Sequence, residues 1–142
     1  MINHSEKVVV CGANGFTGRF LCKELIKKKI PFLAILRPGN DGSWMKKNNI
    51  SYKYADLNNT TELEKEIKGY KSLISVASIG FGCVPSILKA CKNKNINRVI
   101  FTSTTAIFTK LNVKSKKIRE LAEEQIKESN LDWTIIRPTM IY

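Results

Sequence analysis

The sequence predicts an α/β fold in which helices cover both faces of a doubly wound parallel sheet. Short apolar runs alternate with amphipathic helical patterns along the 142 residues. Most of these runs are apolar at every position, so both faces of the strands should be buried. Helices between the strands make them parallel, and right-handed crossovers then give the strand order 3-2-1-4-5-6. We expect a ligand crevice at the carboxyl ends of strands one and four, where the order reverses.

The predicted strands are apolar or aromatic, and they are bounded by Gly, Pro, Asn or charged residues. They cover residues 7–11, 31–36, 51–55, 72–77, 98–104 and 133–138. Helical patterns fill residues 16–29, 61–70, 83–95 and 115–129. The segment RPGNDGSW (37–44) is predicted to be a loop by its Pro, Gly, Asn and Asp content.

Two of the helices carry finer expectations. The apolar positions of the first helix fall on one face, which should pack on the sheet. They are Phe16, Phe20, Leu21, Leu25 and Ile26. The helix over 61–70 should be capped by Thr60 or Thr61 and close at Gly69.

Length and composition fit one domain over residues 1–142, because 43% apolar content is enough for a single buried core. The leading residues, MINHSEK, are polar and run directly into the first strand. No stretch approaches the roughly 18 consecutive apolar residues of a membrane span. We therefore expect a cytoplasmic chain without a signal peptide or a membrane partner.

The cysteines and the histidine do not form a metal-binding pattern. Cys11, Cys22, Cys83 and Cys91 lie in apolar stretches without C-x-x-C spacing, and His4 lies in the leading tail. Free thiols in a reducing cytoplasm fit this distribution, and we expect no metal site.

The formal net charge of +12 raises the question of nucleic-acid binding, because clustered lysines neutralise phosphates. The lysines are scattered instead: some end the first helix, Lys46 and Lys47 lie in a predicted loop, and others open the last helix. No basic stripe is interleaved with exposed Tyr or Phe, as stacking on a single strand requires. A nucleic-acid partner is therefore not expected.

The stretch CGANGFTGR (11–19) places three glycines between the first strand and the first helix. Gly12 lets the chain turn sharply, Gly15 lets the backbone approach a pyrophosphate, and Gly18 lets the helix pack closely. The helix N-terminus adds N–H groups and partial positive charge for the phosphates. A simple tight turn would also use glycines, but the order strand, turn, helix favours a dinucleotide site. Its predicted residues are Gly12, Asn14, Gly15, Phe16, Thr17 and Gly18.

The end of the second strand indicates which dinucleotide the site prefers. Proteins that prefer NAD usually place an acidic residue there, whereas this strand is followed by Arg37, and the next carboxylate is Asp41. A guanidinium suits a 2'-phosphate, so NADP is expected, with NAD as the alternative. Arg37 could instead be a solvated surface arginine. Arg19, after the third glycine, is a second candidate for a phosphate contact or else a surface residue.

These motifs resemble the atypical and extended branches of the short-chain dehydrogenase/reductase superfamily, and the resemblance covers nearly the whole chain. Similar patterns occur in NmrA-like NADP-binding proteins, in flavin and biliverdin reductases, and in nucleotide-sugar epimerases and dehydratases. The matching segments are GANGFTGR (12–19), Arg37, ADL (55–57), SVAS (75–78), VIFTSTTAIF (99–108) and LDWTIIRPTMIY (131–142).

The resemblance implies a Rossmann fold with NADP as cofactor, and it assigns roles to residues beyond the glycines. One pair would border the adenine, a second would pass the ribose, and a third would flank the nicotinamide. In that order the pairs are Asp56 and Leu57, Ala77 and Ser78, and Pro138 and Thr139.

The catalytic residues depart from the family's pattern. Many family enzymes use a Ser with a Tyr-x-x-x-Lys pair, in which the lysine helps the tyrosine to exchange a proton. Ser103 matches the serine, but Ser115 and Arg119 stand where the tyrosine and the lysine would be. A guanidinium donates hydrogen bonds but stays protonated, so it cannot relay a proton. Ser103 and Arg119 are the candidate catalytic residues; alternatively, Ser103 only ends a strand and Arg119 is a solvated helix residue.

Family members also continue beyond the RPTMIY segment into elements that build the substrate pocket, whereas this sequence stops at Tyr142. We expect the substrate segment to be lacking, through a truncated or split gene or because a partner supplies it. An exposed apolar edge after the sixth strand would favour a homodimer or marginal stability. Two functions stay open: a reductase or sugar-nucleotide epimerase/dehydratase, and a non-catalytic NADP-binding sensor or regulatory module.

Overall fold

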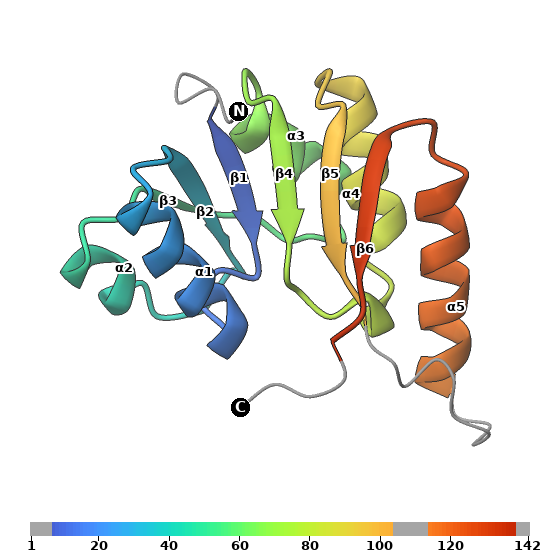
Figure 1. Ribbon diagram of the computed structural model, residues 1–142, viewed down its shortest axis with the longest axis horizontal. Coiled ribbons are helices and arrows are strands. Elements are labelled where there is room, and N and C mark those ends of the chain that lie inside the picture. Colours follow the sequence, from blue (N-terminus) through green and yellow to red (C-terminus); the bar gives the residue numbers. More distant parts are fainter. Residues whose placement is uncertain (1–6, 104–113, 139–142) are drawn as a thin grey trace.

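A computed structural model of the chain describes residues 7–103 and 114–138. Six parallel strands form one sheet in the order β3-β2-β1-β4-β5-β6, which confirms the predicted fold class (Figure 1). The strands are β1 (Val8–Cys11), β2 (Phe32–Leu36), β3 (Tyr52–Tyr54), β4 (Ser72–Ser75), β5 (Arg98–Thr102) and β6 (Asp132–Ile136). The order reverses between β1 and β4, so their carboxyl ends lie side by side where a ligand crevice was expected.

Helices cover the sheet from both sides (Figure 1). The helices are α1 (Phe16–Lys27), α2 (Ser43–Lys47), α3 (Thr60–Ile67), α4 (Val84–Asn93) and α5 (Lys114–Lys127), with a 3-10 turn η1 (Ile79–Phe81). Leu25 of α1 and Met45 of α2 belong to one core cluster with β1 and β2. Residues of α3, α4 and α5 form the larger cluster on the opposite face. Within the described ranges, no helix has the length and apolar content to cross a membrane.

Helix α1 turns only part of the predicted apolar face to the sheet. Its buried residues are Gly18, Cys22 and Leu25, whereas Phe16, Phe20 and Ile26 are 58%, 55% and 47% exposed. Gly18 sets this rotation, because a Cβ there would lie 2.1 Å from the carbonyl oxygen of Gly12. Cys22 and Leu25, four and seven positions after Gly18, then lie on the same face of the helix and pack toward the sheet. The predicted apolar face is therefore confirmed for Leu21 and Leu25 and wrong for Phe16, Phe20 and Ile26.

The predicted loop 37–44 contains the start of a helix. α2 begins at Ser43, so Lys46 and Lys47 end a helix and do not lie in a loop. The carboxylate of Asp41 accepts hydrogen bonds from the amide and the hydroxyl of Ser43, which favours a helical turn after it. These hydrogen bonds also lower the pKa of Asp41. Five residues are too few to show a helical apolar pattern, so α2 could not be recognised from its sequence.

The cap of helix α3 also differs from the prediction. Asn59 is the N-cap, and its side-chain oxygen accepts a hydrogen bond from the amide of Glu62 at 3.1 Å. Thr60 and Thr61 lie inside the first turn, so neither caps the helix. The Glu62 carboxylate accepts from the amide of Asp56 at 2.8 Å, which ties the end of β3 to α3.

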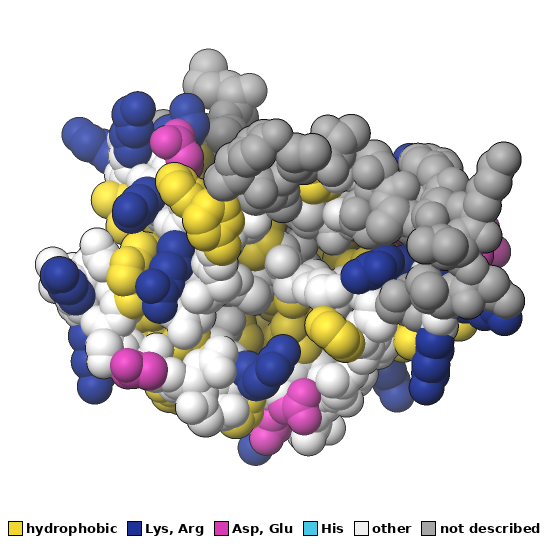
Figure 2. Space-filling view, turned by 90° about the horizontal axis from the view of Figure 1, so that it is seen from below, with side chains coloured by type: hydrophobic (Ala, Val, Ile, Leu, Met, Phe, Trp, Pro, Cys, Tyr) yellow, Lys and Arg dark blue, Asp and Glu magenta, His cyan; other side chains and the backbone are white. Residues whose placement is uncertain are grey.

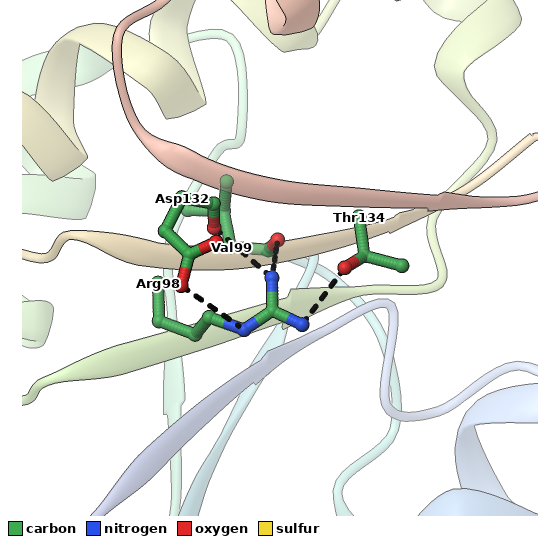
Figure 3. Close-up of polar contacts among 4 residues, drawn as sticks. All are labelled: Arg98, Val99, Asp132 and Thr134. Atoms are coloured by element: carbon green, nitrogen blue, oxygen red, sulfur yellow. Dashed lines mark hydrogen bonds and ion pairs between the residues drawn. The ribbon is translucent and has the colours of Figure 1, made fainter.

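The edge strand β6 is joined to β5 through a polar side chain as well as the backbone. The guanidinium of Arg98 in β5 donates two hydrogen bonds to β6. One goes to the carbonyl oxygen of Asp132 at 3.0 Å and the other to the hydroxyl of Thr134 at 2.8 Å (Figure 3). Trp133 and Ile136 of β6 remain 38% and 50% exposed. The apolar edge and the homodimer that the sequence analysis expected after the sixth strand both stay predictions.

Candidate functional site

A cavity of about 660 Å³ opens at the carboxyl ends of β1, β2, β3 and β4. Figure 2 looks onto this edge of the sheet and shows hydrophobic side chains in a hollow, with Lys and Arg side chains around it. The predicted cofactor residues that line the cavity are Gly12, Asn14, Gly15, Arg37, Asp56, Leu57, Ala77 and Ser78. The structure thus brings together residues from four separate loops, at the crevice that the strand order predicted.

The three glycines have three different surroundings. Gly12 has φ +78°, and a Cβ there would lie 2.6 Å from the amide nitrogen of Ala77, so the loop crosses close to the end of β4. Gly18 is equally crowded, against the Gly12 carbonyl. Gly15 is not: a Cβ there would meet only the Gly12 carbonyl oxygen, at 3.5 Å, among the described residues. Internal packing explains the first and third glycines but leaves open space over the second.

The start of α1 supplies donors beside this open space. Gly15 is the N-cap of the helix, with an extended backbone and without a side chain to accept from the first turn. Its amide donates to the carbonyl of Gly12 at 3.2 Å, which closes the loop. Helix N-termini carry partial positive charge and N–H groups, so this loop suits a phosphate group.

Arg37 and Asp56 are the charged side chains among the described residues that line the cavity. Arg37 is exposed, and its guanidinium has no hydrogen-bond or ion-pair partner within the described ranges. The Asp56 carboxylate already accepts from the amide of Asn58 at 2.9 Å. The Asp56 carboxylate thus already accepts a hydrogen bond within its own turn, whereas the Arg37 guanidinium is available to bind an anion.

Other predicted residues lie away from this cavity. Phe16 lines a smaller cavity on the outside of α1, Thr17 is half-buried in the first turn, and Gly18 is buried beneath the glycine loop. Pro138 is half-buried after β6, and Thr139 falls outside the described residues.

The two candidate catalytic residues are not among the described residues that line the cavity. Ser103 follows β5; its amide donates to the carbonyl of Ile136 at 2.7 Å. Its hydroxyl is buried and has no hydrogen-bond partner in the described part of the chain. Arg119 of α5 is half-buried against η1, where its Nε would lie 3.0 Å from a Cβ on Gly80. The side chain of Ser115 is outside the described set.

Sequence reasoning missed Phe81 and Cys83, which also line the cavity. Cys83 is buried and its thiol donates to the carbonyl of Ser78 at 3.7 Å. Burial raises the pKa of this thiol, so it stays neutral at physiological pH. The available signal was the Gly-rich SIGFGC segment (78–83), because the loop after the fourth strand must lie beside the first.

Two further expectations bear on other ligands. Among the described residues, no group of three or more His, Cys, Asp or Glu side chains is placed to hold a metal ion. The surface of α1 does carry exposed Phe16 and Phe20 beside Lys23, with the Lys23 ammonium 5.7 Å from the Phe20 ring. Basic and exposed aromatic side chains are therefore interleaved on α1, which differs from the sequence-based expectation. The interleaved stretch is shorter than two helical turns.

Known structures share this fold. A short-chain dehydrogenase/reductase from Veillonella parvula, solved in complex with NADP, is 21% identical with a TM-score of 0.81, covering 96% of this chain and 70% of that one. A nucleoside-diphosphate-sugar epimerase from Staphylococcus aureus is 19% identical with a TM-score of 0.77, covering 92% of this chain and 50% of that one. The predicted resemblance to short-chain dehydrogenases/reductases and epimerases is confirmed at the level of fold.

Sequence comparison adds a relative and a family. The Saccharomyces cerevisiae protein named UPF0659 protein YMR090W is 27% identical over an alignment 157 residues long. The alignment covers 93% of this chain and 68% of the yeast protein. The family model described as NAD(P)H-binding matches residues 12–142, from the first glycine of the loop onward. With the glycine loop, the strand order and the cavity in agreement with that match, the chain belongs to the NAD(P)H-binding family.

Proposed function

We propose that the chain binds NADPH in the cavity at the carboxyl ends of β1, β2, β3 and β4, in preference to NADH. The observation that carries the proposal is the open space over Gly15, where a Cβ would touch only Gly12 at 3.5 Å. A side chain would fit the protein at that position, so the glycine is explained by a ligand that approaches the backbone. The NADP complex of the Veillonella structure supports the same group.

The preference for NADPH rests on Arg37. Its guanidinium lines the cavity just after β2 and has no partner within residues 7–103 and 114–138. A charge-assisted hydrogen bond to the 2'-phosphate would strengthen NADPH binding by about 1 to 3 kcal/mol relative to NADH. Calorimetric titration of both dinucleotides into the wild type and Arg37→Ala tests this. We expect the variant to lose the preference and keep NADH affinity; equal affinities in the wild type would refute it.

We further propose that the fold serves an oxidoreductase or a nucleotide-sugar epimerase/dehydratase. Bound NADP supplies or accepts hydride in such enzymes. The buried hydroxyl of Ser103, which lacks a partner among the described residues, would be the group that contacts substrate, and Arg119 would donate hydrogen bonds without relaying protons. The yeast relative matches over 68% of its length, which supports a substrate pocket that needs residues beyond the matched region, in a longer chain or a partner.

A second candidate is a non-catalytic NADP(H)-binding sensor or regulatory module. It is favoured by the packing of Arg119 against Gly80, which gives this side chain a structural role in holding α5 against η1. In either case the buried cysteines, all free, support a reducing compartment such as the cytoplasm. Reduction of substrate by the isolated protein would distinguish the enzyme from the sensor.

A further inference from the structure

We propose that Arg19 is a positioning residue for recognition of the cofactor's 2'-phosphate, because it fixes which end of the Asn14 amide is free to face the ligand. The inference rests on the proposed NADPH site. It assigns a role to an arginine that the sequence pattern left as a second phosphate contact or a surface residue.

The contact between the two side chains is direct. Nε and Nη2 of Arg19 donate to the same atom, Asn14 Oδ1, at 3.3 and 3.0 Å. A guanidinium carries donors only, so the amide oxygen must face Arg19 and the NH2 group must point the other way. With Arg19 in place, Asn14 therefore offers N–H donors rather than an acceptor to its remaining surroundings.

Arg19 is itself held in position. Its guanidinium lies 5.1 Å from the centre of the Trp44 ring, at the start of α2, and the side chain is half-buried. Stacking on an aromatic face and two hydrogen bonds restrict the rotation of a long side chain. α2 follows directly from the loop that carries Arg37, so the contact also ties the glycine loop to the segment after β2.

Asn14 lies where this orientation matters. It lines the main cavity together with Arg37, and it also lines the smaller cavity that contains Arg19 and Trp44. One of its N–H groups reaches the carbonyl of Asp41 at 3.4 Å, near the limit for a hydrogen bond, and no second acceptor is recorded within the described residues. A phosphate accepts hydrogen bonds, so a fixed donor in the cavity that Arg37 also lines would attract it, whereas an amide oxygen there would repel it.

The test compares NADPH and NADH affinities by calorimetry in the wild type, Asn14→Asp, Arg19→Lys and Lys23→Leu. Asn14→Asp keeps an oxygen for Arg19 and retains the fold, but it replaces the donor with an acceptor. Arg19→Lys keeps the charge but loses the planar pair of donors. Lys23→Leu is the matched control, because it removes one positive charge from the same helix, one turn further on, without touching Asn14.

We expect Asn14→Asp to reduce the NADPH to NADH preference about tenfold or more. Arg19→Lys should reduce the preference about fivefold, and Lys23→Leu should leave it within about twofold. An unchanged preference in either Asn14→Asp or Arg19→Lys would overturn the inference. If the wild type binds neither dinucleotide, the proposed function itself is refuted. If it binds both with equal affinity, the proposed NAD(P)H site is supported, but 2'-phosphate recognition and this role of Arg19 are refuted.

Discussion

A Cβ on Gly18 would lie 2.1 Å from the carbonyl oxygen of Gly12 and 2.7 Å from the Cα of Ala13. The first turn of α1 therefore lies directly on the glycine loop, backbone against backbone. This contact sets the rotation of α1 and fixes the end of β1 below the cavity. Gly15, between the two, is left with open space on its outer side.

Replacement of Gly18 by Ala should destabilise the fold by about 2 to 3 kcal/mol, because backbone atoms at that distance cannot move aside without shifting the helix. Urea unfolding followed by circular dichroism measures the loss. Gly15→Ala is the matched control: its new Cβ makes an ordinary 3.5 Å contact, so its unfolding free energy should stay within about 1 kcal/mol of the wild type. Equal losses in the two variants would contradict the contact.

Stability should fall at alkaline pH through the buried thiols. Burial raises the pKa of Cys91 to about 12, whereas an unfolded cysteine titrates near about 8.5. The folded protein then holds a proton that the unfolded chain releases, so this contribution is complete below pH 8.5 and is lost as pH rises toward the folded pKa. The slope reaches about 1.4 kcal/mol per pH unit for one thiol.

Urea unfolding between about pH 7 and pH 9.5 tests this prediction, in a window below the titration of most lysines and tyrosines. Cys91→Ala should show a shallower decline than the wild type, even though its stability at neutral pH is lower. Parallel declines in the two proteins would show that Cys91 does not contribute. Thiol labelling offers a second readout, since neutral buried thiols react slowly.

The purified chain should show no NADPH oxidation above background with quinones, flavins, biliverdin or 4-keto sugar nucleotides. The tyrosine and lysine of the family dyad are replaced by Ser115 and Arg119, and loss of general acid catalysis costs roughly 10² to 10⁴-fold. Weak positioning of substrate would remove a larger proximity contribution as well. Robust turnover with any of these substrates that disappears in Ser103→Ala would contradict this prediction.

The topology and many of the residues that line the crevice could be predicted because they depend on chain order and glycine spacing. Strands apolar on both faces and helical connections lead to one strand order, and that order places Gly12, Arg37, Asp56 and Ala77 at one edge of the sheet. The residues of the crevice are thus largely set by which loops follow which strands, which a sequence shows directly.

What the sequence could not show depends on close contacts that an apolar pattern does not reveal. The rotation of α1 is decided by the approach of Gly18 to Gly12, which overrides the apolar pattern of Phe16 and Phe20. The contact of Arg19 with Trp44 likewise needs α2, which is too short to leave a periodic pattern.

The most direct test of the NADPH site is a calorimetric titration of NADPH into the wild type and Gly15→Val. The variant adds a Cβ that makes an ordinary 3.5 Å contact with the Gly12 carbonyl oxygen, and its branched methyl groups would occupy the space of a pyrophosphate on the proposed site. We predict measurable NADPH binding by the wild type, and none by a Gly15→Val protein whose circular dichroism and unfolding midpoint remain close to those of the wild type. NADPH binding by folded Gly15→Val with wild-type affinity would show that the cofactor does not lie on this loop.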